Sequence, residues 1–234
     1  NQMERNRLSE IREQMRERGV DALLVTNVKN INYFSRFSGS TATAIITLDR
    51  SFFLTDGRYI LLANAEVKDS EIVEYHQAAD PMQMAANVIN ELRPSRLGFE
   101  SDYTSYTSYS ILRSLVREDI ELVPATRIIE EVRISKDSEE VSNFKKAVKI
   151  VDDCFTHLID FIRPGMTERD IAYEIGIFLY KHGATRLAAD YVVAAGPHAA
   201  FPHFQATDAV LEYGQMVKMD FGAGVKGMES DLTR

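Results

Sequence analysis

Residues 218–234 read KMDFGAGVKGMESDLTR, a run of small and apolar residues with an aspartate near each end. The GVKG segment, residues 224–227, is a tight-turn candidate between two short strands. If Val225 and Lys226 form the turn, Asp220 lies directly opposite Asp231. Opposed residues of an antiparallel pair share one face of the sheet, with Cβ atoms about 5 Å apart. We therefore predict that the two carboxylates converge on one point.

Two converging carboxylates predict a metal site. Like charges so close repel, and one carboxylate would have to bind a proton unless a cation neutralises the pair. Carboxylate oxygens are natural ligands for hard divalent cations, and two-ion sites use them as bridging ligands. The alternative is that both aspartates only cap or border a solvated hairpin, because a register slip of one residue would separate them.

Residues 194–208, AAGPHAAFPHFQATD, place two histidines between a predicted strand and the hairpin. An imidazole can donate a hydrogen bond, accept one or bind a metal near neutral pH. His198 and His203 are therefore candidate site residues, with an ordinary surface or packing role as the alternative for each.

The motifs, taken in order, resemble those of the pita-bread metallopeptidases, and within that family the Xaa-Pro group of prolidase and aminopeptidase P. In the second half of the chain they are PH at 202–203, TD at 207–208, MDFGA at 219–223 and SDLTR at 230–234. ISKDSEEV at 134–141 and RPGMTERDIA at 163–172 resemble the start of the family's catalytic domain. INYFSRFSGS at 31–40 and TDGRY at 55–59 resemble its creatinase-like N-terminal domain.

This resemblance implies a fold and a set of roles. We expect a creatinase-like, ribonuclease H-like α/β domain over residues 1–130 and an incomplete pita-bread α+β domain over 131–234. It implies that Asp220 binds one metal ion, that Asp231 bridges two, and that His203 contacts substrate and stabilises the tetrahedral intermediate. The implied reaction is hydrolysis of the peptide bond that precedes proline, with two manganese, cobalt, zinc or iron ions, in a homodimer.

The chain also departs from the family pattern. The family draws a third metal-binding residue, a histidine, and two glutamates from beyond the SDxTR motif, so we expect this chain to be a fragment that binds metal weakly or not at all and lacks activity. Ala189 stands where the family usually has an aromatic residue. A metal-independent creatinase-type amidinohydrolase and a non-catalytic binding protein are the alternatives, and the presence of both aspartates disfavours them.

Composition limits the class of protein. The chain has 234 residues, of which 45% are hydrophobic and 26% charged, and a formal net charge of −8. This acidic balance argues against a nucleic-acid partner. No stretch approaches the roughly 18 uncharged apolar residues that a membrane span requires. A single cysteine, Cys154, suits a reducing compartment, and we expect the cytoplasm.

The pattern of apolar residues predicts different secondary structure in the two halves of the chain. Six short strands alternate with helices in the first half, at residues 21–26, 43–48, 51–55, 71–75, 96–100 and 120–124. In the second half a long amphipathic helix begins after Asp137 and ends before residues 163–165, and a second runs from Thr167 to Gly183. The predicted buried stripe of the long helix is Val141, Phe144, Val148, Val151, Phe155, Leu158 and Ile162, and we expect Cys154 to pack beside it.

Overall fold

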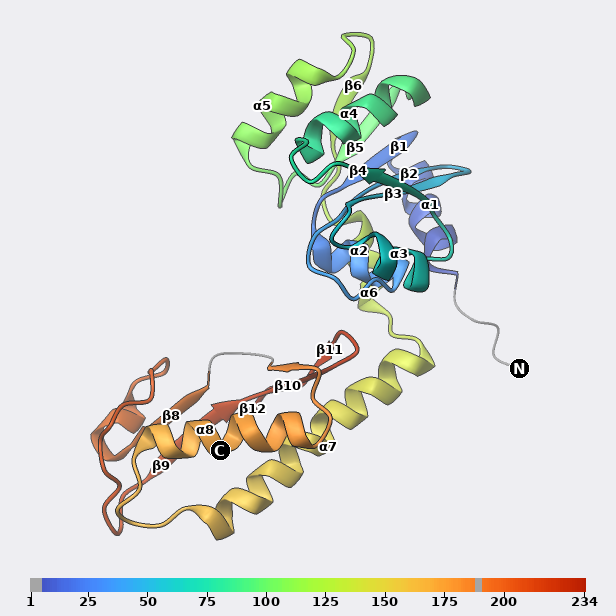
Figure 1. Ribbon diagram of the computed structural model, residues 1–234. Coiled ribbons are helices and arrows are strands. Elements are labelled where there is room, and N and C mark those ends of the chain that lie inside the picture. The colour runs from blue at the N-terminus through green and yellow to red at the C-terminus, as the bar shows by residue number, and fades with distance from the viewer. Residues whose placement is uncertain (1–5, 188–190) are drawn as a thin grey trace. The chain divides into compact units, whose positions relative to one another are not determined.

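The computed structural model describes residues 6–187 and 191–234, and Ala189 therefore lies outside the described residues. The chain divides into two compact units, Asn1–Ser135 and Lys136–Arg234 (Figure 1). None of the helices in the described ranges has both the length and the apolar character that crossing a bilayer requires.

The first unit is a six-stranded mixed sheet in the order β4-β3-β2-β1-β5-β6. Its strands are β1 (Ala22–Val25), β2 (Thr43–Thr47), β3 (Ser51–Asp56), β4 (Glu71–Tyr75), β5 (Arg96–Phe99) and β6 (Glu121–Pro124). Pairing is antiparallel between β1 and β2 and between β2 and β3, and parallel elsewhere. All six predicted strands are confirmed, because short β-branched and aromatic runs bounded by turn residues are specific signals.

Helices cover both faces of this sheet. They are α1 (Arg7–Glu17), α2 (Val28–Ser35), α3 (Ile60–Glu66), α4 (Pro81–Leu92), α5 (Tyr106–Leu115) and α6 (Ile128–Ile134). One apolar core joins α1, α2, α3 and α6 to residues such as Leu23 and Phe53, and another joins α4 and α5 to Leu24 and Phe52. Successive side chains of a strand thus point to opposite faces of the sheet, so each strand contributes to the helix-covered core on either side, as an α/β domain requires.

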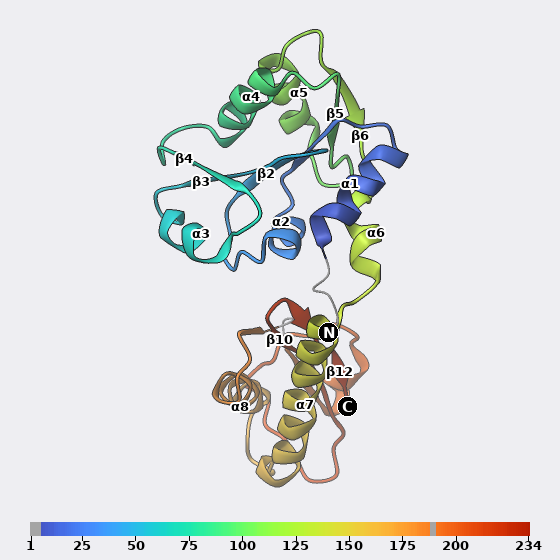
Figure 2. The ribbon, with the colours of Figure 1, turned by 90° about the vertical axis from the view of Figure 1, so that its right-hand side faces the viewer.

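The second unit contains two long helices and a long hairpin (Figure 1), and Figure 2 shows α8 nearly end-on beside α7. The helices are α7 (Ser138–Phe161) and α8 (Glu168–Lys181). The strands are β7 (Arg186–Leu187), β8 (Val192–Ala195), β9 (Val217–Phe221), β10 (Ala223–Val225), β11 (Met228–Glu229) and β12 (Leu232–Thr233), and the 3-10 helix η1 (Gly196–Ala200) follows β8. They form two three-stranded sheets, β11-β10-β7 and β12-β9-β8. The first arm of the hairpin consists of β9 and β10 and the second of β11 and β12, so each arm contributes one strand to each sheet.

The starts of both helices agree with the sequence analysis. Asp137 and Glu140 form a capping box at the start of α7, and Thr167 and Asp170 form one at the start of α8. In each, the cap side chain accepts a hydrogen bond from the third backbone N–H while the acidic side chain accepts one from the cap N–H, which satisfies two otherwise free donors. The capping box of Thr167 and Asp170 fixes where α8 begins, and it makes Glu168 the first residue of that helix.

The buried face of α7 differs from the predicted one in its first half. Val141, Phe144 and Val148 are 40%, 46% and 36% exposed, whereas Asn143 and Ala147 are buried. Ala147 faces the hairpin, and its carbonyl oxygen accepts a hydrogen bond of 3.1 Å from Ser230 Oγ. A small side chain is needed where a strand comes this close to the helix, so the close approach, and not the row of large apolar residues, sets the face.

The second half of α7 follows the prediction more closely. Val151 and Leu158 are buried, and Cys154 is fully buried in the same core. Burial raises the pKa of the Cys154 thiol to about 12, with a smaller contribution from the charge of Glu174. Cys154 is thus a packing residue, as expected, because a reactive thiol needs an accessible, electropositive setting.

Replacing Ala147 by leucine tests which face of α7 is buried. We expect Ala147→Leu to lower the free energy of unfolding of the second unit by about 1–3 kcal/mol, because the larger side chain overpacks the contact with the hairpin. Lys146→Leu places the same side chain one residue away on the exposed face, and it should leave stability nearly unchanged. Hydrogen exchange of α7 peptides in increasing urea measures both, and equal losses would contradict the assignment.

Candidate active site

The hairpin turn differs from the predicted one by one residue. Gly224 pairs with Glu229 and Val225 with Met228, so Lys226 and Gly227 are the turn residues. Their φ angles are +47° and +83°. A two-residue turn with positive φ at both positions matches the twist of the flanking strands, and glycine adopts it without strain. The predicted turn would have put the β-branched Val225 in this conformation, where it is a steric outlier.

The shifted turn also corrects the predicted pairing of the two aspartates. Asp220 lies opposite Thr233 and Phe221 opposite Leu232. The same register continues through the hydrogen bond from Ser230 N to Ala223 O, which places Asp231 opposite Gly222 and not opposite Asp220. The difference between predicted and observed partners is two residues. Because side chains alternate with a period of two, this shift leaves both aspartates on the same face.

That shared face points away from the hydrophobic core. Phe221 and Ser230 are buried, and Leu232 packs against the core of the second unit. Their neighbours in the alternation, Asp220 and Asp231, are half-buried and exposed respectively. Residues related diagonally across an antiparallel pair lie about 7–8 Å apart at Cα, within reach of side chains that lean together. The two carboxylates are thus diagonal neighbours across the strand pair, with Asp231 directly opposite Gly222.

The donor set fits part of a divalent-cation site. Within the described ranges, neither aspartate side chain has a hydrogen bond or ion pair to the protein. Two hard, anionic oxygen ligands without protein partners on one face are suited to bind such a cation. The described residues hold no group of three or more His, Cys, Asp or Glu side chains arranged around one ion, so the aspartates by themselves are an incomplete set.

The loop that carries His203 is attached to the strand that carries Asp220. Lys218 lies two residues before Asp220 on β9 and therefore on the same face. Its Nζ donates a hydrogen bond to Phe201 O and a second, of 3.4 Å, to Pro202 O. His203 follows directly, is exposed, and has no hydrogen-bond partner among the described residues. The strand face with the aspartates and the histidine loop are thus neighbours.

His198 lies apart from this arrangement and has a different partner. Its Nδ1 is 2.8 Å from Glu168 Oε1. Since an ionised carboxylate only accepts, this contact makes Nδ1 the protonated nitrogen. The ring also packs against Phe204, with centroids 4.5 Å apart. His198 therefore serves the loop's structure, and of the two candidate histidines only His203 stays a predicted site residue.

Glu168 is a residue that the sequence analysis missed. Its side chain is fully buried and accepts hydrogen bonds from Ala195 N at 2.8 Å, Thr207 N at 3.0 Å and Thr207 Oγ1 at 2.7 Å, in addition to the contact with His198. Burial favours the neutral form and tends to raise the pKa of Glu168, but these hydrogen bonds to the charged form outweigh it and hold the pKa below its ordinary value.

The sequence gives only a weak signal for this role. Glu168 occupies the first helical position after the Thr167 cap, where acidic residues are common because they favour the positive end of the helix dipole. Such residues are usually solvated. Helical periodicity places Glu168 on the same face as the buried Ile171 and Ile175, but the loop residues that satisfy its carboxylate cannot be predicted from α8 alone.

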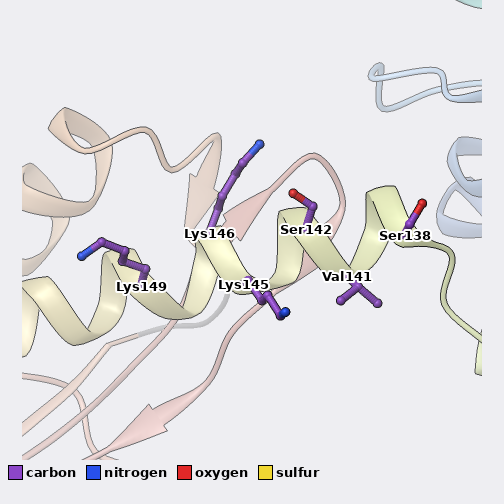
Figure 3. Close-up of a pocket in the computed structure, with 6 residues that line it drawn as sticks. All are labelled: Ser138, Val141, Ser142, Lys145, Lys146 and Lys149. Atoms are coloured by element: carbon purple, nitrogen blue, oxygen red, sulfur yellow. The ribbon is translucent and has the colours of Figure 1, made fainter.

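A separate depression on α7 is not part of this site. It has a volume of 410 Å³ and is lined by Ser138, Val141, Ser142, Lys145, Lys146 and Lys149. Figure 3 shows that the three lysine side chains point in different directions from one helix. Lys149 is paired with Asp153 at 2.8 Å. The depression has no convergent polar groups, and it is a solvated helix surface.

Comparison with protein families gives two matches that together cover most of the chain. Residues 7–135 match the Creatinase/Prolidase N-terminal domain, and residues 142–234 match metallopeptidase family M24. The curated protein named Uncharacterized peptidase YqhT, from Bacillus subtilis, is 36% identical over 97% of this chain and 64% of its own length.

Solved structures give the same picture. A structure described as Xaa-Pro dipeptidase from Bacillus anthracis has a TM-score of 0.89 and 36% identity, over 97% of this chain and 63% of that one. An X-Pro aminopeptidase from Thermotoga maritima has a TM-score of 0.82 and 30% identity, over 95% of this chain and 64% of its own. The chain therefore spans a little under two thirds of the length of these relatives.

The charge on Glu168 predicts a pH dependence of stability. A carboxylate whose pKa is lower in the folded than in the unfolded state stabilises the fold above the ordinary value of 4.5, and this contribution is lost as the pH falls through the folded-state pKa. Glu168→Gln should thus destabilise the second unit most at neutral pH and progressively less below that value. Thermal unfolding across this range measures it, and a penalty that grows toward acid pH would contradict the assignment.

Proposed function

The chain belongs to the creatinase/prolidase group of metallopeptidase family M24, and on this premise we propose that its protein binds divalent cations at Asp220 and Asp231 and hydrolyses the peptide bond preceding proline. Relatives named Xaa-Pro dipeptidase and X-Pro aminopeptidase support this substrate class. Because the chain spans only 62–65% of the length of its curated relatives, the activity is proposed for the full-length gene product.

One observation carries the proposal: the hairpin register leaves both aspartates on the face away from the core. Asp231 lies across from Gly222, which has no side chain to compete for the space. In this arrangement Asp231 would hold two ions with its two carboxylate oxygens, and Asp220 would hold one ion from the adjacent strand. A one-residue difference in register would have buried one carboxylate in place of Ser230 or Phe221.

The remaining chemistry falls to the loop and the ions. Bound divalent cations would supply Lewis-acid polarisation of the peptide carbonyl and a water of lowered pKa. His203, exposed beside the Asp220 face, is proposed to donate a hydrogen bond to the carbonyl oxygen as negative charge develops on it. Manganese, cobalt, zinc and iron are the proposed ions, and a homodimer is the proposed assembly.

The proposed activity can be assayed directly. The full-length gene product, supplied with Mn²⁺, should hydrolyse a Xaa-Pro dipeptide, lose this activity on treatment with a chelator and regain it when the metal is restored. It should prefer that substrate to the matching Xaa-Ala dipeptide. Failure to cleave Xaa-Pro bonds with any of the four proposed ions would contradict the proposal, and metal-independent hydrolysis of creatine would assign the protein to a different reaction.

The bridging role of Asp231 gives a stoichiometric prediction. Asp231→Asn should abolish two-ion binding in the full-length gene product, because a neutral amide leaves the charge of two adjacent cations uncompensated. Asp153→Asn makes the same chemical change on the exposed face of α7 and should not alter metal content. Elemental analysis after equilibration with Mn²⁺ measures both, and retention of two ions by Asp231→Asn would disprove the bridging assignment.

A further inference from the structure

We propose that Glu168 is a positioning residue for His203: its buried carboxylate ties together the two ends of the loop 196–206 and so holds His203 beside the Asp220 face. The inference rests on the proposed function, in which His203 contacts substrate. Glu168 itself touches neither substrate nor metal in this account, and acts only through the loop.

Each of the two carboxylate oxygens of Glu168 binds one end of the loop. Oε1 accepts from Ala195 N and lies 2.8 Å from His198 Nδ1, where the chain leaves β8. Oε2 accepts from Thr207 N at 3.0 Å and Thr207 Oγ1 at 2.7 Å, where the loop ends. A single side chain therefore closes the loop, in the way that compact surface loops with adjacent ends are stabilised.

The anchor is itself firmly held. Glu168 is the first residue of α8, whose Ile171, Ile175 and Leu179 are fully buried. Its backbone N–H donates to Ala209 O at 3.1 Å, and the next N–H donates to Thr207 O at 3.1 Å. The helix start and the end of the loop are thus joined through both backbone and side chain, and a displaced carboxylate would displace the loop.

Contacts run from this anchor to the neighbours of His203. The His198 ring packs on Phe204, and Phe204 stacks on Phe201 with centroids 5.8 Å apart. Lys218 Nζ binds Phe201 O and Pro202 O from the strand side. The residues before and after His203 are therefore fixed, while His203 itself has no protein partner in the described ranges and is available to a substrate.

A glutamine at position 168 tests the charge and hydrogen-bonding pattern of the carboxylate without changing the size of the side chain. A carboxylate accepts hydrogen bonds at both oxygens, whereas an amide accepts at one end and donates at the other. Glu168→Gln therefore keeps the side-chain volume but turns an amide NH₂ group toward the donors at one end of the loop. Those donors are either Ala195 N and His198 Nδ1 or the backbone N–H and hydroxyl of Thr207. The variant should release one end without leaving a cavity.

A double-mutant cycle in the full-length gene product tests the positioning role. We expect Glu168→Gln to lower kcat on a Xaa-Pro dipeptide by about tenfold to a hundredfold, the scale of effect that a small misplacement of a catalytic group produces. His203→Ala should lower kcat by roughly 10²–10³, the usual cost of one oxyanion donor. The double variant should match His203→Ala alone, because no histidine remains to be positioned. Metal content should be unchanged in all three, and multiplicative losses in the double variant would overturn the proposal.

Glu174→Gln is the matched control. Glu174 lies on the same helix, and its carboxylate is 2.7 Å from His157 Nε2, so the substitution alters an equivalent carboxylate–histidine contact away from the loop. It should leave kcat unchanged. A loss of kcat as large as that of Glu168→Gln would show that any disturbance of α8 suffices, which contradicts a specific role.

Hydrogen exchange of the metal-free protein provides a readout that does not depend on activity. Backbone amides of residues 195–207 should exchange at least about tenfold faster in Glu168→Gln, with α7 unchanged, since local opening is governed by the contacts that close the segment. Thr207→Val removes the hydroxyl that donates to Glu168 and accepts from Ala209 N but keeps the backbone donor, so it should give a smaller effect of the same kind and serves if Glu168→Gln does not fold. Unchanged exchange in the loop would overturn the proposal, whereas faster exchange in a protein without Xaa-Pro activity would leave Glu168 as the loop anchor and remove only the proposed function.

Discussion

The backbone pairing of the two hairpin arms is the constraint on which the candidate site depends. Met219 and Arg234 exchange two hydrogen bonds of 2.8 Å, and the Lys226–Gly227 turn closes the far end. Ser230 reinforces this register from the core side, because its hydroxyl contacts both Ala147 O and Ala223. A slip of one residue would turn Asp231 toward the core in place of Ser230, and the cost of burying an unpaired carboxylate opposes it.

The two sides of the site are held by different means. Backbone hydrogen bonds fix the aspartates, whereas the histidine loop is held by backbone bonds at its ends together with two side chains, Glu168 at both ends and Lys218 near its middle. Side-chain anchors are well suited to a loop, since irregular backbone has no ladder of its own to satisfy its polar groups. The buried Glu168 has four donors around it, which makes a fully buried carboxylate compatible with the fold.

Much of the fold follows from local sequence. The six strands of the first unit and the caps at Asp137 and Thr167 are encoded by neighbouring residues, and all were predicted correctly. Errors arose where tertiary contacts decide. Large apolar residues such as Phe144 indicated one face of α7, but the close approach of the hairpin selects the small Ala147 instead.

The same distinction applies to the site. The shared face of Asp220 and Asp231 was predicted correctly although their direct opposition was wrong, because an even shift in register preserves the face. Positive φ at Lys226 and Gly227 determined that shift, and the GVKG segment contained the necessary glycine. The partners of Glu168 could not be predicted, because they lie about 30 to 40 residues further along the chain and meet it only in the folded unit.

The most direct measurement is anomalous diffraction from crystals of the full-length gene product equilibrated with Mn²⁺. The account predicts two ordered cations on the face of the hairpin away from the hydrophobic core, both bonded to Asp231 and one of them to Asp220, at about 2.0–2.6 Å, as expected for carboxylate ligands of hard divalent ions. Ordered cations bound only elsewhere, with both carboxylates free of metal, would contradict it.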